Sequence, residues 1–97
     1  MGGRYEEELA ITDVAVTERS STTAMVSWKT NRLARGKVNY GPDISYGSAI
    51  FEETFATTHA VQLINLEPGS HVVFEILATD INGLQVYDAY YGFETLE

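Results

Sequence analysis

Hydrophobic and polar residues alternate with a period of two along most of the chain, and turn residues interrupt the alternation at short intervals. The clearest example is residues 59–80, whose first run places His59, Val61 and Leu63 on one face. Leu66-Glu67-Pro68-Gly69 follows, and the second run has as its inward positions Val72, Phe74, Ile76 and Ala78. Alternation bounded by Pro-Gly is typical of strands with one buried face, because proline and glycine supply the backbone angles of a sharp reversal. This stretch predicts two strands joined by a tight corner.

The remainder of the chain repeats the pattern. A first strand is expected from Ile11, with Ile11, Val14 and Val16 as its inward residues. Further strands are expected over Ala24–Trp28, Arg35–Tyr40 and Gln85–Glu94. The segment Ile44–Thr58 is less regular and fits one short edge strand or two. Turns separate the strands at Thr30-Asn31-Arg32, Gly41-Pro42-Asp43 and Asn82-Gly83, the last a strong hairpin signal. About seven short strands in about 90 residues predict an all-β protein, a seven-stranded antiparallel immunoglobulin-like β-sandwich.

Composition narrows the classes of partner. A length of 97 residues predicts one domain with a core of its own. The chain contains no cysteine, so we expect no disulfide and no thiolate metal site, and the core must stabilise the fold. The single tryptophan, Trp28, lies on the apolar face of its strand and is expected in that core. The net charge of -8 and a pI near 4.5 argue against nucleic acid and anionic membranes as partners, because the field repels phosphate. No apolar run approaches the ~20 residues of a membrane span, so no membrane insertion is expected.

The ends of the chain differ from its middle. Residues 1–9 hold three consecutive glutamates without periodicity, which indicates a solvated N-terminal tail, disordered or derived from cloning. Met1-Gly2-Gly3 has no apolar segment behind it and is not a signal peptide. The folded domain is expected over residues 10–95. Residues 96–97, Leu-Glu, are either a cloning remnant or the end of a complete small protein.

Four segments carry a family resemblance: Val26-Ser27-Trp28, Gly36–Gly41, Leu66-Glu67-Pro68-Gly69 and Val72–Asp80. In this order and spacing they resemble the strand B tryptophan, strand C, the corner before strand F and strand F of a fibronectin type III domain. The resemblance covers about residues 10–95. The chain is also similar to prokaryotic forms of the family, on the pattern Trp28-Lys29-Thr30-Asn31, then Val38-x-Tyr40-Gly41, then Tyr46-Gly47, then His59-x-Val61-x-Leu63. The resemblance implies fibronectin type III topology for the sandwich.

One position departs from the family pattern. The family usually has a tyrosine six residues after the corner leucine, and its hydroxyl bonds back to the backbone, but this chain has Val72 there. We therefore expect packing and the Pro-Gly turn alone to hold the corner. The loop after Asp80 contains no Arg-Gly-Asp, so integrin binding through that motif has no basis here.

The prokaryotic forms occur within secreted or cell-surface enzymes and adhesins, and ahead of some metallophosphatase domains. The resemblance implies a non-catalytic spacer or protein-interaction module in a larger extracellular or cell-surface protein, with neighbouring domains or another protein as partners. Two alternatives stay open. One is a carbohydrate- or polymer-binding module that uses surface tyrosines on a polysaccharide, and the other is an accessory domain of a secreted hydrolase such as a metallophosphatase.

The residues that could carry chemistry have simpler structural explanations. His59 is expected to begin its strand at the sandwich edge, and His71 is expected to point outward; two histidines without spaced partners are a poor zinc signal. Residues 80–83 lack the remaining ligands of a calcium loop and favour a hairpin turn. The run Ser20–Thr23 has no activating context. We therefore predict no catalytic residue, no metal site and no cofactor.

Exposed aromatic residues are the remaining candidates for binding. By strand parity Tyr87 and Tyr90 do not both fit inside a sandwich, and Tyr46 lies in the irregular segment. Val73 and Leu77 face away from the core on the strand that starts at Val72. Surface aromatic rings stack on sugars or anchor neighbouring domains, and an apolar strip suits contact with a protein. These five residues form the predicted binding set, with edge packing and scattered exposure as the structural explanation for each.

Overall fold

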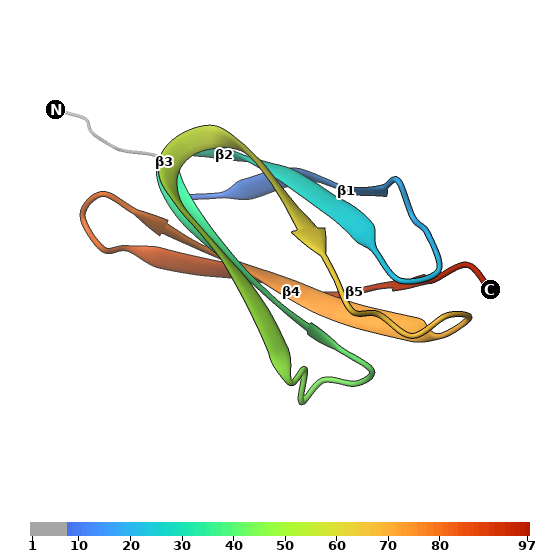
Figure 1. Cartoon of the computed structure of the whole chain (residues 1–97). Helices are drawn as coiled ribbons and strands as arrows, with labels where there is room; N and C mark the ends of the chain where they lie inside the picture. The colour runs from blue at the N-terminus through green and yellow to red at the C-terminus, as the bar shows by residue number, and fades with distance from the viewer. Residues whose placement is uncertain (1–7) are drawn as a thin grey trace, which may run out of the picture.

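Five antiparallel β-strands make up the regular structure of residues 8–97, which are the residues that the computed structural model describes (Figure 1). They are β1 (Ile11–Thr17), β2 (Ala24–Gly41), β3 (Ser48–Leu63), β4 (His71–Asp80) and β5 (Gln85–Glu94). The main path of hydrogen-bonded neighbours is β1-β2-β4-β5, and β3 also pairs with β2. Within residues 8–97 no helix is both long and apolar enough to span a membrane.

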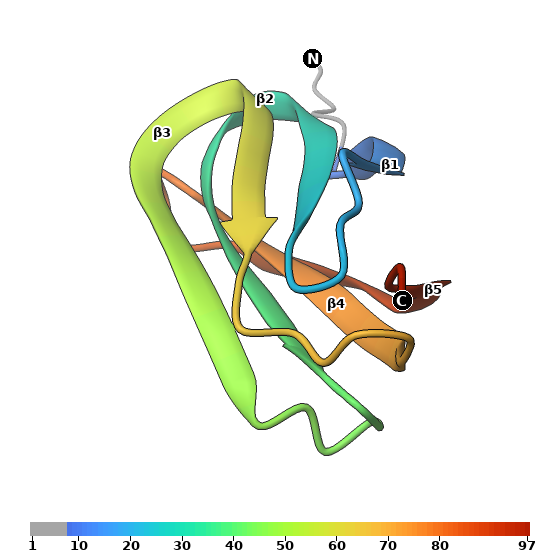
Figure 2. The ribbon, with the colours of Figure 1, turned by 45° about the vertical axis from the view of Figure 1, so that its right-hand side comes forward.

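Two long strands, β2 and β3, connect the two layers of the fold. The first half of β2 pairs with β1 and with the end of β3, and its second half pairs with the start of β3 and with β4. The β2–β3 register shifts between Lys29 and Gly36, and both strands curve together there (Figure 2). Irregular pairing lets a strand bend from one layer into the other without losing its backbone bonds.

The structure therefore has five strands where the sequence predicted seven. Thr30-Asn31-Arg32 does not end a strand, because β2 runs through it and the Asn31 amide still donates to the Ala10 carbonyl at 3.3 Å. The irregular segment Ile44–Thr58 likewise does not form one or two short edge strands. From Ser48 it belongs to the 16-residue β3.

The hydrophobic core lies between the two layers. Its largest fully buried side chains are those of Trp28, Phe74, Leu63, Ile76, Val26 and Val38. These residues occupy the alternate positions that the sequence pattern assigned inward, so the predicted parity of β2, β4 and the end of β3 is confirmed. His59 shares the predicted parity of Val61 and Leu63 and is 4% exposed, stacked on Trp28 with ring centroids 5.1 Å apart. The expectation that it begins its strand at the sandwich edge was wrong, because it lies inside β3.

The fold begins earlier than the sequence suggested. Leu9, assigned to a solvated tail, is 3% exposed and packs with Ala34 and Ala78. The Asn31 side chain fixes this segment, donating to the Glu8 carbonyl and accepting from the Ala10 amide. The rest of the predicted tail, residues 1–7, lies outside the described residues. At the other end, the Leu96 amide donates to the Ser20 carbonyl.

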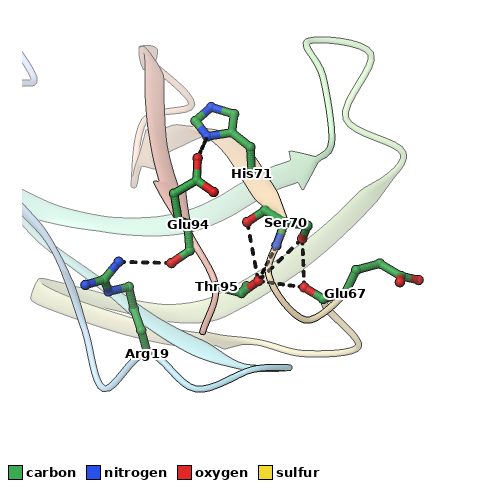
Figure 3. A network of polar contacts seen from close by, with 6 residues as sticks. All are labelled: Arg19, Glu67, Ser70, His71, Glu94 and Thr95. Atoms are coloured by element: carbon green, nitrogen blue, oxygen red, sulfur yellow. Dashed lines mark hydrogen bonds and ion pairs between the residues drawn. The ribbon is translucent and has the colours of Figure 1, made fainter. Parts of the chain in front are cut away.

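The corner at residues 66–70 is held by a polar network rather than by packing and the Pro-Gly turn alone (Figure 3). The Thr95 hydroxyl accepts the Ser70 amide at 2.8 Å and donates to the Glu67 carbonyl at 2.6 Å. Gly69 takes the positive φ of 61° that the turn requires. Tyr40 also reaches this region, donating from its hydroxyl to the Ile64 carbonyl. Hydrogen bonds from residues distant in sequence thus hold the corner, where Val72 offers no hydroxyl group.

Candidate functional site

The outward side of the sheet formed by the second half of β2, the first half of β3, β4 and β5 gathers the predicted binding residues. On β2 and β4 the inward positions are buried, so the alternate side chains face solvent. We call this surface the outer face; its residues are Arg35, Lys37, Asn39, Phe51, Val73, Glu75, Leu77, Tyr87 and Tyr90.

A row of four side chains crosses the outer face. Strand register places Phe51 opposite Lys37, Lys37 opposite Leu77, and Leu77 opposite Tyr87. Residues directly opposite one another on neighbouring strands have adjacent side chains. Phe51 is 62% exposed and Tyr87 is 63% exposed, so the row has an open aromatic ring at each end.

Two hollows lie on this face, one on each side of its centre. Tyr46, Val73 and Tyr90 line the first, about 360 Å³ in volume, together with Ile44 and His71. The second, about 320 Å³, is lined by Arg35, Lys37, Phe51, Leu77 and four further polar residues, Glu52, Glu53, Thr79 and Gln85, besides Gly36. All five predicted binding residues therefore lie on one side of the molecule. Tyr46, Val73 and Tyr90 line the first hollow, whereas Leu77 and Tyr87 lie outside it, opposite each other on β4 and β5.

A bulge in β5 aims Tyr90 outward. Phe74 pairs with Tyr91 and Ile76 pairs with Asp88, so two residues of β5 lie opposite Glu75 alone. Tyr90 has a φ of 73° and is 88% exposed, whereas Tyr91 stacks on Phe74 with ring centroids 5.2 Å apart. An extra residue in one strand redirects the side chains that follow it. Simple alternation across β5 misses this.

Tyr91 and Tyr46 both have a raised pKa, for different reasons. The Tyr91 hydroxyl donates to Asp88 at 2.6 Å, and this bond, with burial and the Asp88 charge, raises the pKa of Tyr91 to about 12. Burial, followed by the nearby Glu75 carboxylate, raises the pKa of Tyr46. Both tyrosines are neutral hydrogen-bonding groups at physiological pH.

Two cations on the outer face were not singled out by the sequence pattern. The Lys37 ammonium lies 5.1 Å from the centroid of the Phe51 ring, and the Arg35 guanidinium lies 5.8 Å from that of Phe55. Alternation along β2 predicts that Arg35 and Lys37 share the outward face, and the structure confirms it. The aromatic partners come from β3, whose register with β2 only the tertiary structure defines.

The histidines have structural roles. His59 bonds through Nε2 to the Thr30 hydroxyl at 2.9 Å and through Nδ1 to the Glu52 carboxylate, so both ring nitrogens are satisfied. His71 is exposed, as predicted, and pairs with Glu94 across β4 and β5. Within residues 8–97 no three histidine, cysteine or acidic side chains come together in a way that could hold a metal ion.

Asp80 organises the turn between β4 and β5. Its carboxylate accepts the backbone amides of Asn82 and Leu84 and the Arg32 guanidinium, at 2.9–3.1 Å. Burial alone would raise the pKa of Asp80, but the Leu84 and Asn82 amides and Arg32 together hold that pKa below its usual value of 3.8. The carboxylate is committed to the hairpin, in agreement with the turn that the sequence predicted.

We expect the Asp80→Asn variant to unfold at a lower temperature at pH 6, because asparagine cannot offer these donors a charged acceptor. The folded pKa is depressed, so this stabilisation is present above pH 3.8 and is lost as the pH falls through the lower folded value. Thermal unfolding from pH 6 to pH 2 should show the difference between the two proteins shrinking below pH 3.8. Asp43→Asn, in an exposed turn where the side chain accepts the Ser45 amide, is the control and should have a smaller effect. A difference that persists unchanged at pH 2 would contradict this role.

Comparison with known proteins supports the architecture. No family model and no curated protein matches the chain. Among solved structures, a myokine aligns with a TM-score of 0.74 at 22% identity over 91% of this chain and 97% of that one. A computationally redesigned β-sandwich protein aligns with a TM-score of 0.66 at 25% identity over 90% and 94%. The sensor domain of the anti-sigma factor RsgI4 from Pseudobacteroides cellulosolvens aligns with a TM-score of 0.62 at 14% identity over 91% and 94%.

These likenesses place the chain in a class defined by fold. It is an all-β protein whose structural neighbours are β-sandwich proteins. The two layers joined by the bent β2 and β3, with the core between them, agree with that class.

Proposed function

We propose that the chain is a non-catalytic fibronectin type III module that acts as a spacer and protein-interaction domain within a larger extracellular or cell-surface protein. The family assignment counts each of the bent strands β2 and β3 as two, which brings the total to the seven strands of that topology. The four sequence segments that resemble the family support it. The shared sandwich fold of the structural neighbours is consistent with it.

The outer face is the observation that carries the interaction role. Phe51, Tyr87 and Tyr90 are each more than 60% exposed on it, and Leu77 and Val73 lie between them on β4. Exposed aromatic rings that gather on one face beside half-buried aliphatic side chains favour a protein-binding surface over scattered exposure. The alternative, a polysaccharide platform, draws support from the same exposed tyrosines.

The spacer role is supported by the distance between the two ends of the fold. Leu9 packs against Ala78 near the end of β4, whereas Thr95 bonds to Ser70 just before β4 begins. Eight residues of extended strand separate these points, roughly 26 Å at 3.3 Å per residue. Domains fused before and after the sandwich would be held apart by at least that length of rigid sheet.

Hydrogen–deuterium exchange tests the proposal. We expect amides of β4 and β5 to exchange more slowly in the longer parent polypeptide, or in its complex with a partner, than in the isolated chain. Tyr87→Ser together with Tyr90→Ser should reverse the protection, and Ile81→Ser, at a residue 72% exposed in the β4–β5 turn, serves as the control. Equal exchange in both contexts, with protection of these strands by a soluble polysaccharide, would favour the alternative.

A further inference from the structure

Tyr46 and Tyr90, which line the first hollow together, both have a backbone conformation that is unfavourable for a bulky side chain. Their φ angles are 60° and 73°, in the left-handed region. A bulky residue in that region is strained, and strained residues cluster at binding and active sites. Packing does not compensate for the strain at Tyr90, because Tyr90 is 88% exposed. Core stability therefore does not account for its conformation, whereas presentation of the ring to a ligand does.

A carboxylate without a cationic partner lies beside these rings. Glu75 is half-buried on β4, opposite the bulge of β5 that holds Tyr90. After burial, the Glu75 charge and then Tyr90 are the largest causes that raise the pKa of Tyr46, so these three side chains lie close together. Among the described residues Glu75 forms no ion pair, and its carboxylate accepts the uncharged Asn39 amide at 2.8 Å. A partly buried charge of this kind favours a cation from a partner.

The described basic side chains in this region are directed to other groups. His71 lines the hollow but pairs with Glu94 at 2.8 Å. Lys37 is the closest basic residue on β2, the strand next to Glu75. Its ammonium lies over Phe51 of β3, on the opposite side of β2 from Glu75. The Glu75 charge is therefore uncompensated, on a chain whose net charge of -8 also attracts a basic partner.

We propose that the first hollow binds an arginine side chain of a protein partner, with the guanidinium against the Tyr46 and Tyr90 rings and its donors directed to Glu75. The inference rests on the proposed function and names the chemistry of the partner. A guanidinium is planar, so it stacks on aromatic faces and also forms charge-assisted hydrogen bonds with a carboxylate. Ile44 and Val73, which line the same hollow, suit its aliphatic stem. A neutral sugar also stacks on tyrosine rings but gains nothing from the Glu75 charge.

A short peptide and its uncharged analogue test the proposal. The probe is acetyl-Ser-Val-Arg-Val-Ser-amide, and the analogue carries citrulline, which has the shape of arginine without its charge. Binding is followed by NMR titration of the isotope-labelled chain in about 0.15 M NaCl, where charges more than about 8 Å apart are largely screened. We expect the arginine peptide to bind with a Kd about tenfold lower than that of the citrulline peptide, because only the guanidinium makes a charge-assisted contact.

Two glutamates in the same layer separate a specific contact from general attraction. Glu75→Gln keeps an oxygen for the Asn39 amide but removes the charge, and should raise the Kd of the arginine peptide about tenfold. Glu53→Gln removes the same charge beside the other hollow and should change the Kd less than twofold. Tyr90→Leu keeps an apolar side chain but removes the aromatic face, and should raise the Kd about threefold.

Amide shifts in the same spectra locate the contact. Shifts at Tyr46, Val73, Glu75 and Tyr90 on addition of the arginine peptide support the proposal. It is overturned if that peptide does not bind, if the citrulline analogue binds equally, if Glu53→Gln weakens binding as much as Glu75→Gln, or if the shifts lie away from the first hollow. Tighter binding of a neutral oligosaccharide at these residues, unaffected by Glu75→Gln, would overturn it in favour of a sugar.

The result separates this inference from the proposed function. If the parent protein protects β4 and β5 from exchange and Glu75→Gln leaves that protection intact, the arginine inference fails and the interaction role stands. If β4 and β5 are never protected by a protein, the interaction role itself fails.

Discussion

The Trp28→Ala variant is expected to lose about 3–5 kcal/mol of unfolding free energy, the usual cost of truncating a fully buried aromatic side chain. Trp28 is 1% exposed and stacks on His59, which in turn bonds to Thr30 and Glu52. Removing the indole leaves a cavity and frees the histidine ring to move. Domains of this size are stable by only about 5–15 kcal/mol, so this substitution removes a substantial part of the stability of the fold.

Trp28→Phe is the control for this prediction. The indole nitrogen of Trp28 is buried without a hydrogen-bond partner among the described residues, so phenylalanine loses ring volume but no hydrogen bond. We therefore expect a smaller loss than for alanine. Urea unfolding followed by circular dichroism measures both, since the fluorescence of the only tryptophan disappears with the substitution. A loss below about 1 kcal/mol for Trp28→Ala would mean that the core does not depend on this stack.

The second large effect is expected at Gly41, where β2 ends. A Cβ on Gly41 would lie 1.6 Å from the Tyr46 carbonyl oxygen, a backbone atom that cannot rotate away. Gly41→Ala must therefore displace the turn at residues 42–47, and we expect a loss of about 3 kcal/mol, at the upper end of the usual cost of overpacking. The displacement would also carry Tyr46 away from Val73 and Tyr90 and open their shared hollow.

Gly47→Ala, in the same turn, separates steric clash from backbone strain. Gly47 has a φ of 95° but open space around it, so alanine there meets only the conformational penalty of about 1 kcal/mol. Chemical denaturation gives the two free energies, and NMR shifts of the Tyr46 and Tyr90 rings report the hollow. Equal losses for the two variants, or unchanged ring shifts in Gly41→Ala, would contradict the close approach of Gly41 and Tyr46.

The candidate site was predictable where it depends on strand parity. Val73 and Leu77 face outward because side chains alternate along β4, and this needs only local sequence. Tyr87 and Tyr90 were both predicted at the surface, but they lie three residues apart, so strict alternation would expose only one of them. The bulge opposite Glu75 lets both face outward, and a bulge depends on how β4 and β5 pair. The hollow lined by Arg35 and Lys37 required the register of β2 with β3, which brings Phe51 onto Lys37.

The alternation of apolar residues by itself determined that the protein is all-β and which side chains form its core, because a period of two is a local property of strands. The Pro-Gly and Asn-Gly turns were fixed in the same way, since Gly69 and Gly83 supply positive φ angles. Only the tertiary structure decided that β2 and β3 run unbroken between the layers, that Thr95 holds the corner and that Leu9 belongs to the core. These features rest on contacts between segments far apart in sequence, and such contacts leave no periodic pattern in the chain.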